Sequence, residues 1–147
     1  MALKSDLNSD IKAALKGGDR ARTTVLRMVT AAIKQREVDE RIELDDAAIV
    51  AVIDKMVKQR RESEKVYREG GRDDLADKEA AEIDIIRQYL PEPLSDAEID
   101  ALIDAAISES GAESIRDMGK AMGLIKGRAQ GRADMGEVGK KLKARLG

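Results

Sequence analysis

The chain contains no cysteine, histidine, tryptophan or phenylalanine among its 147 residues. The missing cysteine and histidine exclude a disulfide framework, the usual zinc sites, a thiol nucleophile and an imidazole base. Any catalysis would therefore rest on serine, lysine, tyrosine or carboxylate side chains. The only aromatic residues are Tyr67 and Tyr89. The apolar content comes mainly from aliphatic side chains, a composition that suits packed helices.

Long apolar segments are also missing. No run of apolar residues approaches the ~18 needed to cross a bilayer. The N-terminal stretch MALKSDLNSDIKAALK carries acids among its lysines, which is typical of neither a secretory signal nor a transit peptide. We therefore expect a soluble protein with no membrane partner and a cytoplasmic location.

Helical periodicity dominates the sequence. Apolar residues recur three and four positions apart, and no segment shows the alternation and turn chemistry of strands. An all-α fold is predicted, with the chain's two prolines, Pro91 and Pro93, marking the clearest boundary. We expect an N-terminal domain of about four helices at 1–91 and a C-terminal three-helix bundle at 92–147.

Several local signals predict where individual helices begin. Ser95, with Glu98 three residues later, has the pattern of a capping box, and Asp134 and Glu137 form a similar pair before the last helix. Asp73 is expected to cap the fourth helix. A polar loop is predicted over 37–44, before a long helix that starts at 45 or 46 and ends at 69.

The segment GKAMGLIKGRAQGR, residues 119–132, places a glycine at every fourth position. Inside a helix each glycine would cost roughly 1 kcal/mol relative to alanine. Packing explains Gly119 and Gly123 most simply, because glycines four apart let a helix approach a neighbour closely. Gly127 is expected to end that helix. The connector at 127–134 would then be either a solvated loop or an anion site at a helix N-terminus.

Charge is distributed unevenly along the C-terminal part of the chain. Residues 92–111 carry six acids and no base, whereas nine bases and four acids follow from 112 to the end. This excess predicts a polyanion-binding face. Two alternatives remain open: cations near helix ends complement the helix dipole, and the basic tail could pair with the acidic helix. The candidate cations are Lys120, Lys126, Arg128, Arg132, Lys140 and Lys141.

A second candidate cluster lies in the sequence KQRRES, at residues 58–63. Polar groups interrupt the apolar stripe of the long helix there. One interpretation is an exposed helix end with i,i+4 ion pairs; the other is an interdomain hydrogen-bond cluster or a ligand contact. The residues concerned are Lys58, Gln59, Arg60 and Ser63.

The segment VIDKMVKQRRESEKVYREGGRDDLADKEAAEIDIIRQYLPEPLS, followed by DMGKAMG and GRAD, resembles the YqeY-like family. Its members are freestanding relatives of the C-terminal part of the GatB subunit of tRNA-dependent amidotransferases. The resemblance covers essentially the whole chain. It implies a helical N-terminal domain and a tRNA-contacting three-helix tail.

The resemblance carries RNA-backbone contacts over to Lys120, Lys126, Arg128 and Arg132. The chain departs from the family pattern at two positions. Gly127 stands where many relatives have proline, and Met135 follows GRAD where many have glycine.

The family is often described as glutamine-dependent carbon–nitrogen ligases, a description that we interpret as inherited from the amidotransferase. The chain has no cysteine nucleophile and no Ser/Gly-rich segment for a serine–lysine arrangement, and it shows no ATP and Mg²⁺ motif. We therefore expect no catalytic residue, metal or cofactor.

The leading hypothesis is a noncatalytic RNA-binding or accessory module for structured RNA, in the first place tRNA. An enzyme of aminoacyl-tRNA synthesis is a further candidate partner. The alternative is a helical protein-interaction adaptor that binds no RNA.

Overall fold

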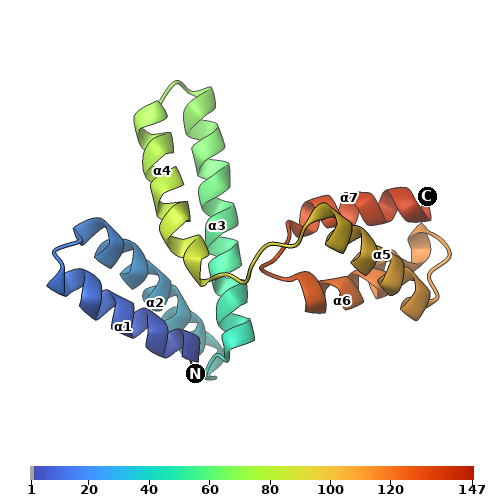
Figure 1. Cartoon of the computed structure of the whole chain (residues 1–147), viewed down its shortest axis with the longest axis horizontal. Helices are drawn as coiled ribbons and strands as arrows, with labels where there is room; N and C mark the ends of the chain where they lie inside the picture. The colour runs from blue at the N-terminus through green and yellow to red at the C-terminus, as the bar shows by residue number, and fades with distance from the viewer. Residues whose placement is uncertain (1) are drawn as a thin grey trace. The chain divides into compact units, whose positions relative to one another are not determined.

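A computed structural model describes residues 2–147, and over these residues the protein is all-α, as predicted (Figure 1). The chain divides into an N-terminal unit, which ends at Leu90, and a C-terminal unit, Pro91–Gly147. That these two units are the predicted domains, 1–91 and 92–147, stays a prediction. The α-helices are α1 (Ala2–Lys16), α2 (Arg20–Glu40), α3 (Asp46–Glu69), α4 (Asp73–Ile86), α5 (Asp96–Ser110), α6 (Met118–Ala129) and α7 (Met135–Leu146).

The N-terminal unit encloses an aliphatic core supplied by all four of its α-helices. Leu7 of α1, Leu26 of α2, Ile53 of α3 and Ile86 of α4 are completely buried. Burying each such side chain stabilises the unit by about 1.5–3 kcal/mol. The fully buried residues of this core therefore include no aromatic side chain, and Tyr89 packs against them while partly buried.

Aspartates cap two of these helices. The Asp19 carboxylate accepts from the backbone N–H of Arg22 at the start of α2, and Asp45 accepts from that of Ala48 at the start of α3. Each bond satisfies an N–H that has no partner within its helix.

The predicted loop over 37–44 is wrong in its first half, because α2 continues to Glu40. The Glu37 carboxylate accepts from Lys4 Nζ at 2.6 Å and from the backbone N–H of Leu44 at 2.8 Å. The hydrogen bond from Lys4 has the larger effect and that from Leu44 the smaller, and both lower the pKa of Glu37 below its ordinary value. The helix ends at Arg41, which has left-handed φ (56°). The last turn of α2 thus contacts both α1 and the segment that leads to α3.

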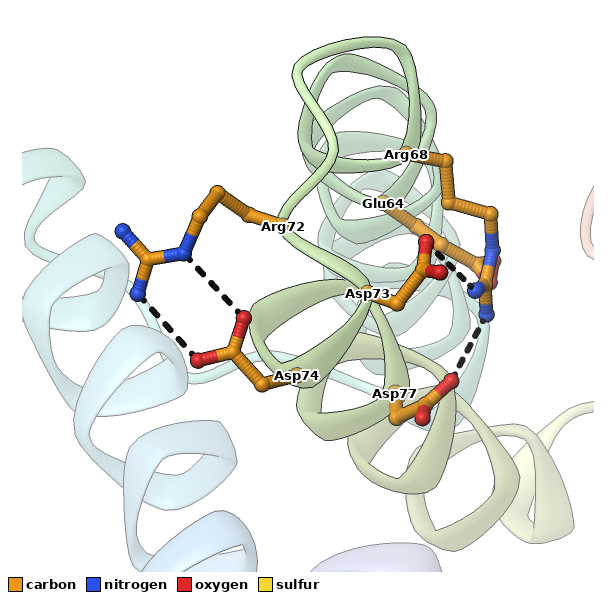
Figure 2. Close-up of polar contacts among 6 residues, drawn as sticks. All are labelled: Glu64, Arg68, Arg72, Asp73, Asp74 and Asp77. Carbon is orange, nitrogen blue, oxygen red and sulfur yellow. Dashed lines mark hydrogen bonds and ion pairs between the residues drawn. The ribbon is translucent and has the colours of Figure 1, made fainter.

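Helices α3 and α4 form a hairpin whose closed end extends beyond α1 and α2 (Figure 1). The turn passes through Gly71, whose φ of 74° favours glycine. Arg68 of α3 donates to Asp77 of α4 at 3.1 Å and to Glu64 at 3.2 Å (Figure 2). The contact with Asp77 joins the two helices next to the turn, whereas Glu64 belongs to α3 itself.

The start of α4 differs from the prediction that Asp73 is its cap. Arg72 occupies the N-cap position and its side chain makes no capping bond. Instead its guanidinium donates to both carboxylate oxygens of Asp74, at 3.1 and 3.2 Å (Figure 2). Asp73 lies one position later, in the first turn, where a carboxylate still complements the helix dipole.

A short 3₁₀ turn, Arg87–Tyr89, ends the N-terminal unit. The Tyr89 hydroxyl donates to Asp10 of α1 at 2.5 Å and accepts from Arg22 of α2 at 3.2 Å. Burial, together with the Asp10 carboxylate, raises the pKa of Tyr89 to about 12. The hydroxyl therefore stays protonated, and it fixes the end of the unit to α1 and α2.

The C-terminal unit has its own core, which includes Ile103 of α5, Ile125 of α6 and Leu142 of α7, all buried. The predicted capping box is confirmed: the Ser95 hydroxyl accepts from the backbone N–H of Glu98, and the Glu98 carboxylate accepts from that of Ser95.

The second capping box, predicted before the last helix, is wrong. Asp134 does cap α7, but it accepts from the backbone N–H of Gly136 at 2.8 Å. The Glu137 carboxylate lies 3.6 Å from Lys140 Nζ on the following turn. Glu137 therefore pairs within α7 and does not reach back to its N-terminus.

Candidate nucleic-acid interface

Helix α6 follows a 3₁₀ turn, Ile115–Asp117, and runs through Gly127 to Ala129. The prediction that Gly127 ends this helix is therefore wrong. The left-handed residue is Gly131, with φ of 79°, in the connector that follows. The connector is shorter than predicted, because the last turn of α6 takes up residues 127–129.

The glycines of α6 lie on its exposed side. Gly119, Gly123 and Gly127 are four residues apart, and all three are exposed. A Cβ atom added at any of them would meet nothing within 4 Å. The helix buries its other side, through Ala121 and Ile125. The interpretation that Gly119 and Gly123 serve close packing is therefore wrong within this unit, because no neighbouring atom approaches their Cβ positions.

Two predicted cations lie beside these glycines. At 100° per residue, Lys126 falls on one side of the line of glycines and Lys120 on the other. Both side chains belong to exposed residues. Within residues 2–147 neither forms an ion pair with a carboxylate, in contrast to Arg128 on the same helix. We call Gly119, Lys120, Gly123, Lys126 and Gly127 the glycine–lysine face.

Arg128 and Arg132 are held inside the C-terminal unit. The Arg128 guanidinium donates to the Glu109 carboxylate of α5 at 2.7 Å. Arg132 donates to the backbone carbonyl of Glu92 at 2.9 Å, and its own carbonyl accepts from Leu94 at 2.8 Å. These two arginines bind the segment before α5 and the end of α5 to the region around α6.

The lysines of α7 also have partners. Lys141 Nζ lies 3.7 Å from the Asp100 carboxylate and 3.8 Å from that of Asp96. Arg145 pairs with Asp104, one turn further along both helices. Lys140 faces Glu137 of its own helix but is mostly exposed. The separation of acids and bases along the sequence is thus partly an intramolecular pairing of α5 with α7.

The second predicted cluster, on α3, does not come together at one point. Lys58 pairs with Asp54 at 3.5 Å, one turn before it. Arg60 is nearly buried and lies 3.3 Å from the Glu82 carboxylate of α4, which connects the two hairpin helices. Gln59 and Ser63 instead line a cavity of about 450 Å³ on another side of α3.

The described part of the chain contains neither a candidate metal site nor a candidate membrane-spanning helix. Residues 2–147 contain no group of three or more acidic, histidine or cysteine side chains placed to hold a metal ion. No helix within the same range is both long enough and apolar enough to cross a bilayer.

Comparison with known proteins gives the family. The family model described as Yqey-like protein matches residues 4–146. This chain belongs to the YqeY-like family. Among curated proteins it is similar to fungal proteins named altered inheritance of mitochondria protein 41, mitochondrial. The Eremothecium gossypii protein is 38% identical over 94 residues, covering 63% of this chain and 51% of the relative. The Candida glabrata protein is 37% identical over 95 residues, covering 63% and 52%.

The YqeY-like chain thus spans about half the length of these relatives. Their names contradict the predicted cytoplasmic location, which is wrong, since the matching proteins are named as mitochondrial. The prediction depended on the composition of the first residues of this chain, and composition alone does not determine the location of a protein in the cell.

Proposed function

We propose that this YqeY-like protein is a noncatalytic RNA-binding or accessory module for structured RNA, in the first place tRNA, and that the glycine–lysine face of α6 contacts the RNA backbone. The observation that carries the proposal is the combination of bare helix backbone with two exposed, unpaired lysines. Three glycines lower helix stability without improving the packing of their own unit. A close approach from outside would explain them.

The chemistry of the face suits a phosphate backbone. Lysine ammonium groups bind phosphates as compact charges. Lys120 and Lys126 are six residues apart, which corresponds to about 9 Å along the helix axis. With no side chain between them, a sugar–phosphate strand can approach the helix closely. Within the described residues, 2–147, no carboxylate pairs with Lys120 or Lys126, so binding would break no ion pair there.

The other predicted cations would contribute less to RNA binding. Arg128 would have to leave Glu109, and Lys141 would have to leave Asp96 and Asp100. Exchanging one ionic partner for another reduces the net gain. We therefore rank Lys120 and Lys126 above the remaining members of the predicted set.

Salt-dependent binding tests the proposal. The 147-residue chain is titrated with a tRNA transcript and with an unrelated duplex RNA over a series of salt concentrations. Each phosphate contact makes the negative slope of log K against log salt steeper by roughly 0.7–0.9. Replacing Lys120 and Lys126 by alanine should therefore make the slope for tRNA shallower by about 1–2 and weaken binding at low salt.

A matched control removes the same charge elsewhere. Lys12 and Lys34 in the N-terminal unit are exposed and form no ion pair within residues 2–147. The Lys12→Ala, Lys34→Ala variant should bind tRNA like the wild type. Equal weakening in both double variants would show that only total charge matters. Unchanged binding in the Lys120, Lys126 variant would remove the glycine–lysine face from the proposal.

The adaptor function is a second candidate, favoured by the pairing of Lys141 and Arg145 with the acids of α5. These contacts remove bases from any polyanion face and give the charge asymmetry a role in folding. If the full chain binds neither RNA at low salt, the adaptor becomes the leading function. Ammonia release from glutamine by the isolated chain would contradict both noncatalytic functions.

A further inference from the structure

Helix α3 carries a regular seam that its own unit covers only in part. Val52, Met56, Gln59, Ser63 and Val66 are spaced alternately four and three residues apart, the spacing by which one helix packs along another. Met56 is buried, whereas Val66 is 63% exposed. Figure 1 shows the hairpin end of α3 extending past α1 and α2. The outer half of the seam therefore lacks a partner within the N-terminal unit.

Two cavities follow this seam and share Gln59 in their linings. One has a volume of about 470 Å³ and lies between α2 and α3, where Ala32, Val52 and Met56 contribute to its wall. The other, of about 450 Å³, is lined by residues of the outer half of α3, including Val66. Together they form a shallow groove along α3.

Two charged residues of opposite sign flank the seam. Lys55 and Glu62 are seven residues apart and therefore occupy the same position of the heptad, beside the groove. Both are exposed, and neither forms an ion pair with another residue of the 2–147 range. Seven residues span about 10.5 Å along a helix, too far for the two groups to pair with each other. Neighbouring charges on α3 do pair, as Asp54 does with Lys58 and Glu64 with Arg68.

We propose that α3 binds α3 of a second copy of this chain in antiparallel orientation. A two-fold axis near the middle of the seam places Lys55 of each copy beside Glu62 of the other, so two ion pairs form at once. In a parallel pair each of these residues would instead face the position five residues further along the partner, so Lys55 would lie beside Arg60 and Glu62 beside Tyr67, with no ion pair. The charge pattern therefore selects the antiparallel arrangement.

The same register pairs the apolar residues. In an antiparallel pair, two residues that lie side by side have residue numbers with a constant sum. The sum is 117 for Lys55 with Glu62 and 118 for Val52 with Val66. The two pairings therefore differ in register by one residue, about 1.5 Å along the helix axis. Val66 of each copy then lies at the cavity between α2 and α3 of the other, where small residues such as Ala32 and Ala51 leave room. One register thus satisfies the ionic and the apolar contacts.

This association goes beyond the proposed RNA function and does not depend on it. The seam has polar Gln59 and Ser63 at its centre, so we expect a weak dimer, with a dissociation constant on the order of micromolar to hundreds of micromolar.

Sedimentation equilibrium of the full, nuclease-treated chain over a wide concentration range tests the proposal. The wild type should show a monomer–dimer equilibrium. Val66→Asp should weaken dimerisation by at least about tenfold, because it replaces the apolar contact with Val52 and Met56 by a carboxylate, in a cavity whose lining also includes Asp39 and Glu40. The matched control is Val38→Asp, since Val38 is also 63% exposed but lies outside the lining of both cavities; it should leave the equilibrium unchanged.

A charge exchange tests the orientation. Lys55→Glu should weaken the dimer by about three- to tenfold, and adding Glu62→Lys should restore wild-type association, because the exchanged charges again face each other. A wild type that stays monomeric at all concentrations overturns the proposal and leaves the groove to a different protein. Failure of the double variant to recover overturns the antiparallel register.

Discussion

Alanine substitutions at the glycines of α6 should raise the stability of the fold and weaken RNA binding, because these glycines lie on the exposed side of the helix. Gly123 lies inside the helix, and an added Cβ meets nothing within 4 Å. Gly123→Ala should therefore stabilise the protein by about 1 kcal/mol, the difference in helix propensity. Gly119 and Gly127 lie in the first and last turns, where the gain is smaller. We expect about 2 kcal/mol for the triple alanine variant.

Thermal unfolding followed by circular dichroism measures this gain. For a unit of this size, 1 kcal/mol raises Tm by roughly 4–8 °C. Gly131→Ala is a control of opposite sign, because Gly131 is buried and has φ of 79°. Forcing alanine into the left-handed region should cost about 1–2 kcal/mol. If Gly123→Ala lowered Tm, the conclusion that its Cβ would face open space would be refuted.

The triple alanine variant also tests the proposed function. Three methyl groups on the glycine–lysine face would hold an RNA backbone away from the helix while leaving every charge in place. Binding of tRNA should weaken about three- to tenfold, equivalent to roughly 0.7–1.4 kcal/mol, although the fold becomes more stable. Unchanged binding would mean that RNA contacts lysine tips only, or another surface.

Three further predictions concern polar contacts that lie inside one unit or the other and stabilise that unit. Glu37→Gln should destabilise the protein near neutral pH and progressively less as the pH falls below about 4, because a lowered folded-state pKa stabilises only while the carboxylate is ionised; urea unfolding at several pH values measures this, and a pH-independent effect would contradict it. Tyr89→Phe removes the hydrogen bond to Asp10 and should cost about 1–2 kcal/mol in the same assay, whereas no loss would show that the contact does not stabilise the unit. Ser95→Ala breaks the capping box with Glu98 and should lower stability by about 1 kcal/mol; Ser95→Asp, which can still cap, should recover most of it.

Features that depend on near neighbours in the chain could be predicted from the sequence. The capping box of Ser95 and Glu98 spans three residues, and α3 follows from a continuous helical pattern with Asp45 at its start. The ends of helices were harder to predict. Glycine permits a helix end but does not require one, and α6 continues through Gly127 because the left-handed turn forms later, at Gly131.

The candidate site shows the same division. Its residue types, Lys120 and Lys126 among glycines, are visible in the sequence. The sequence does not show which of the cations lack a carboxylate partner, because an ion pair depends on the distance between two side chains in the folded protein. Arg128 meets Glu109 from 19 positions away, and Arg132 meets the Glu92 carbonyl from 40 positions away. No local spacing rule relates such residues.

The sequence by itself determined the all-α class, the helices with strong periodicity and the Ser95–Glu98 capping box, since backbone hydrogen bonds and i,i+3 or i,i+4 contacts act within one turn. Only the tertiary structure decided that Gly119 and Gly123 face outward and that Arg128 is already paired. It also decided that Val66 of α3 is left uncovered. These outcomes depend on which helix faces lie against one another, and that is set by how separate segments pack, which the spacing within a single segment does not specify.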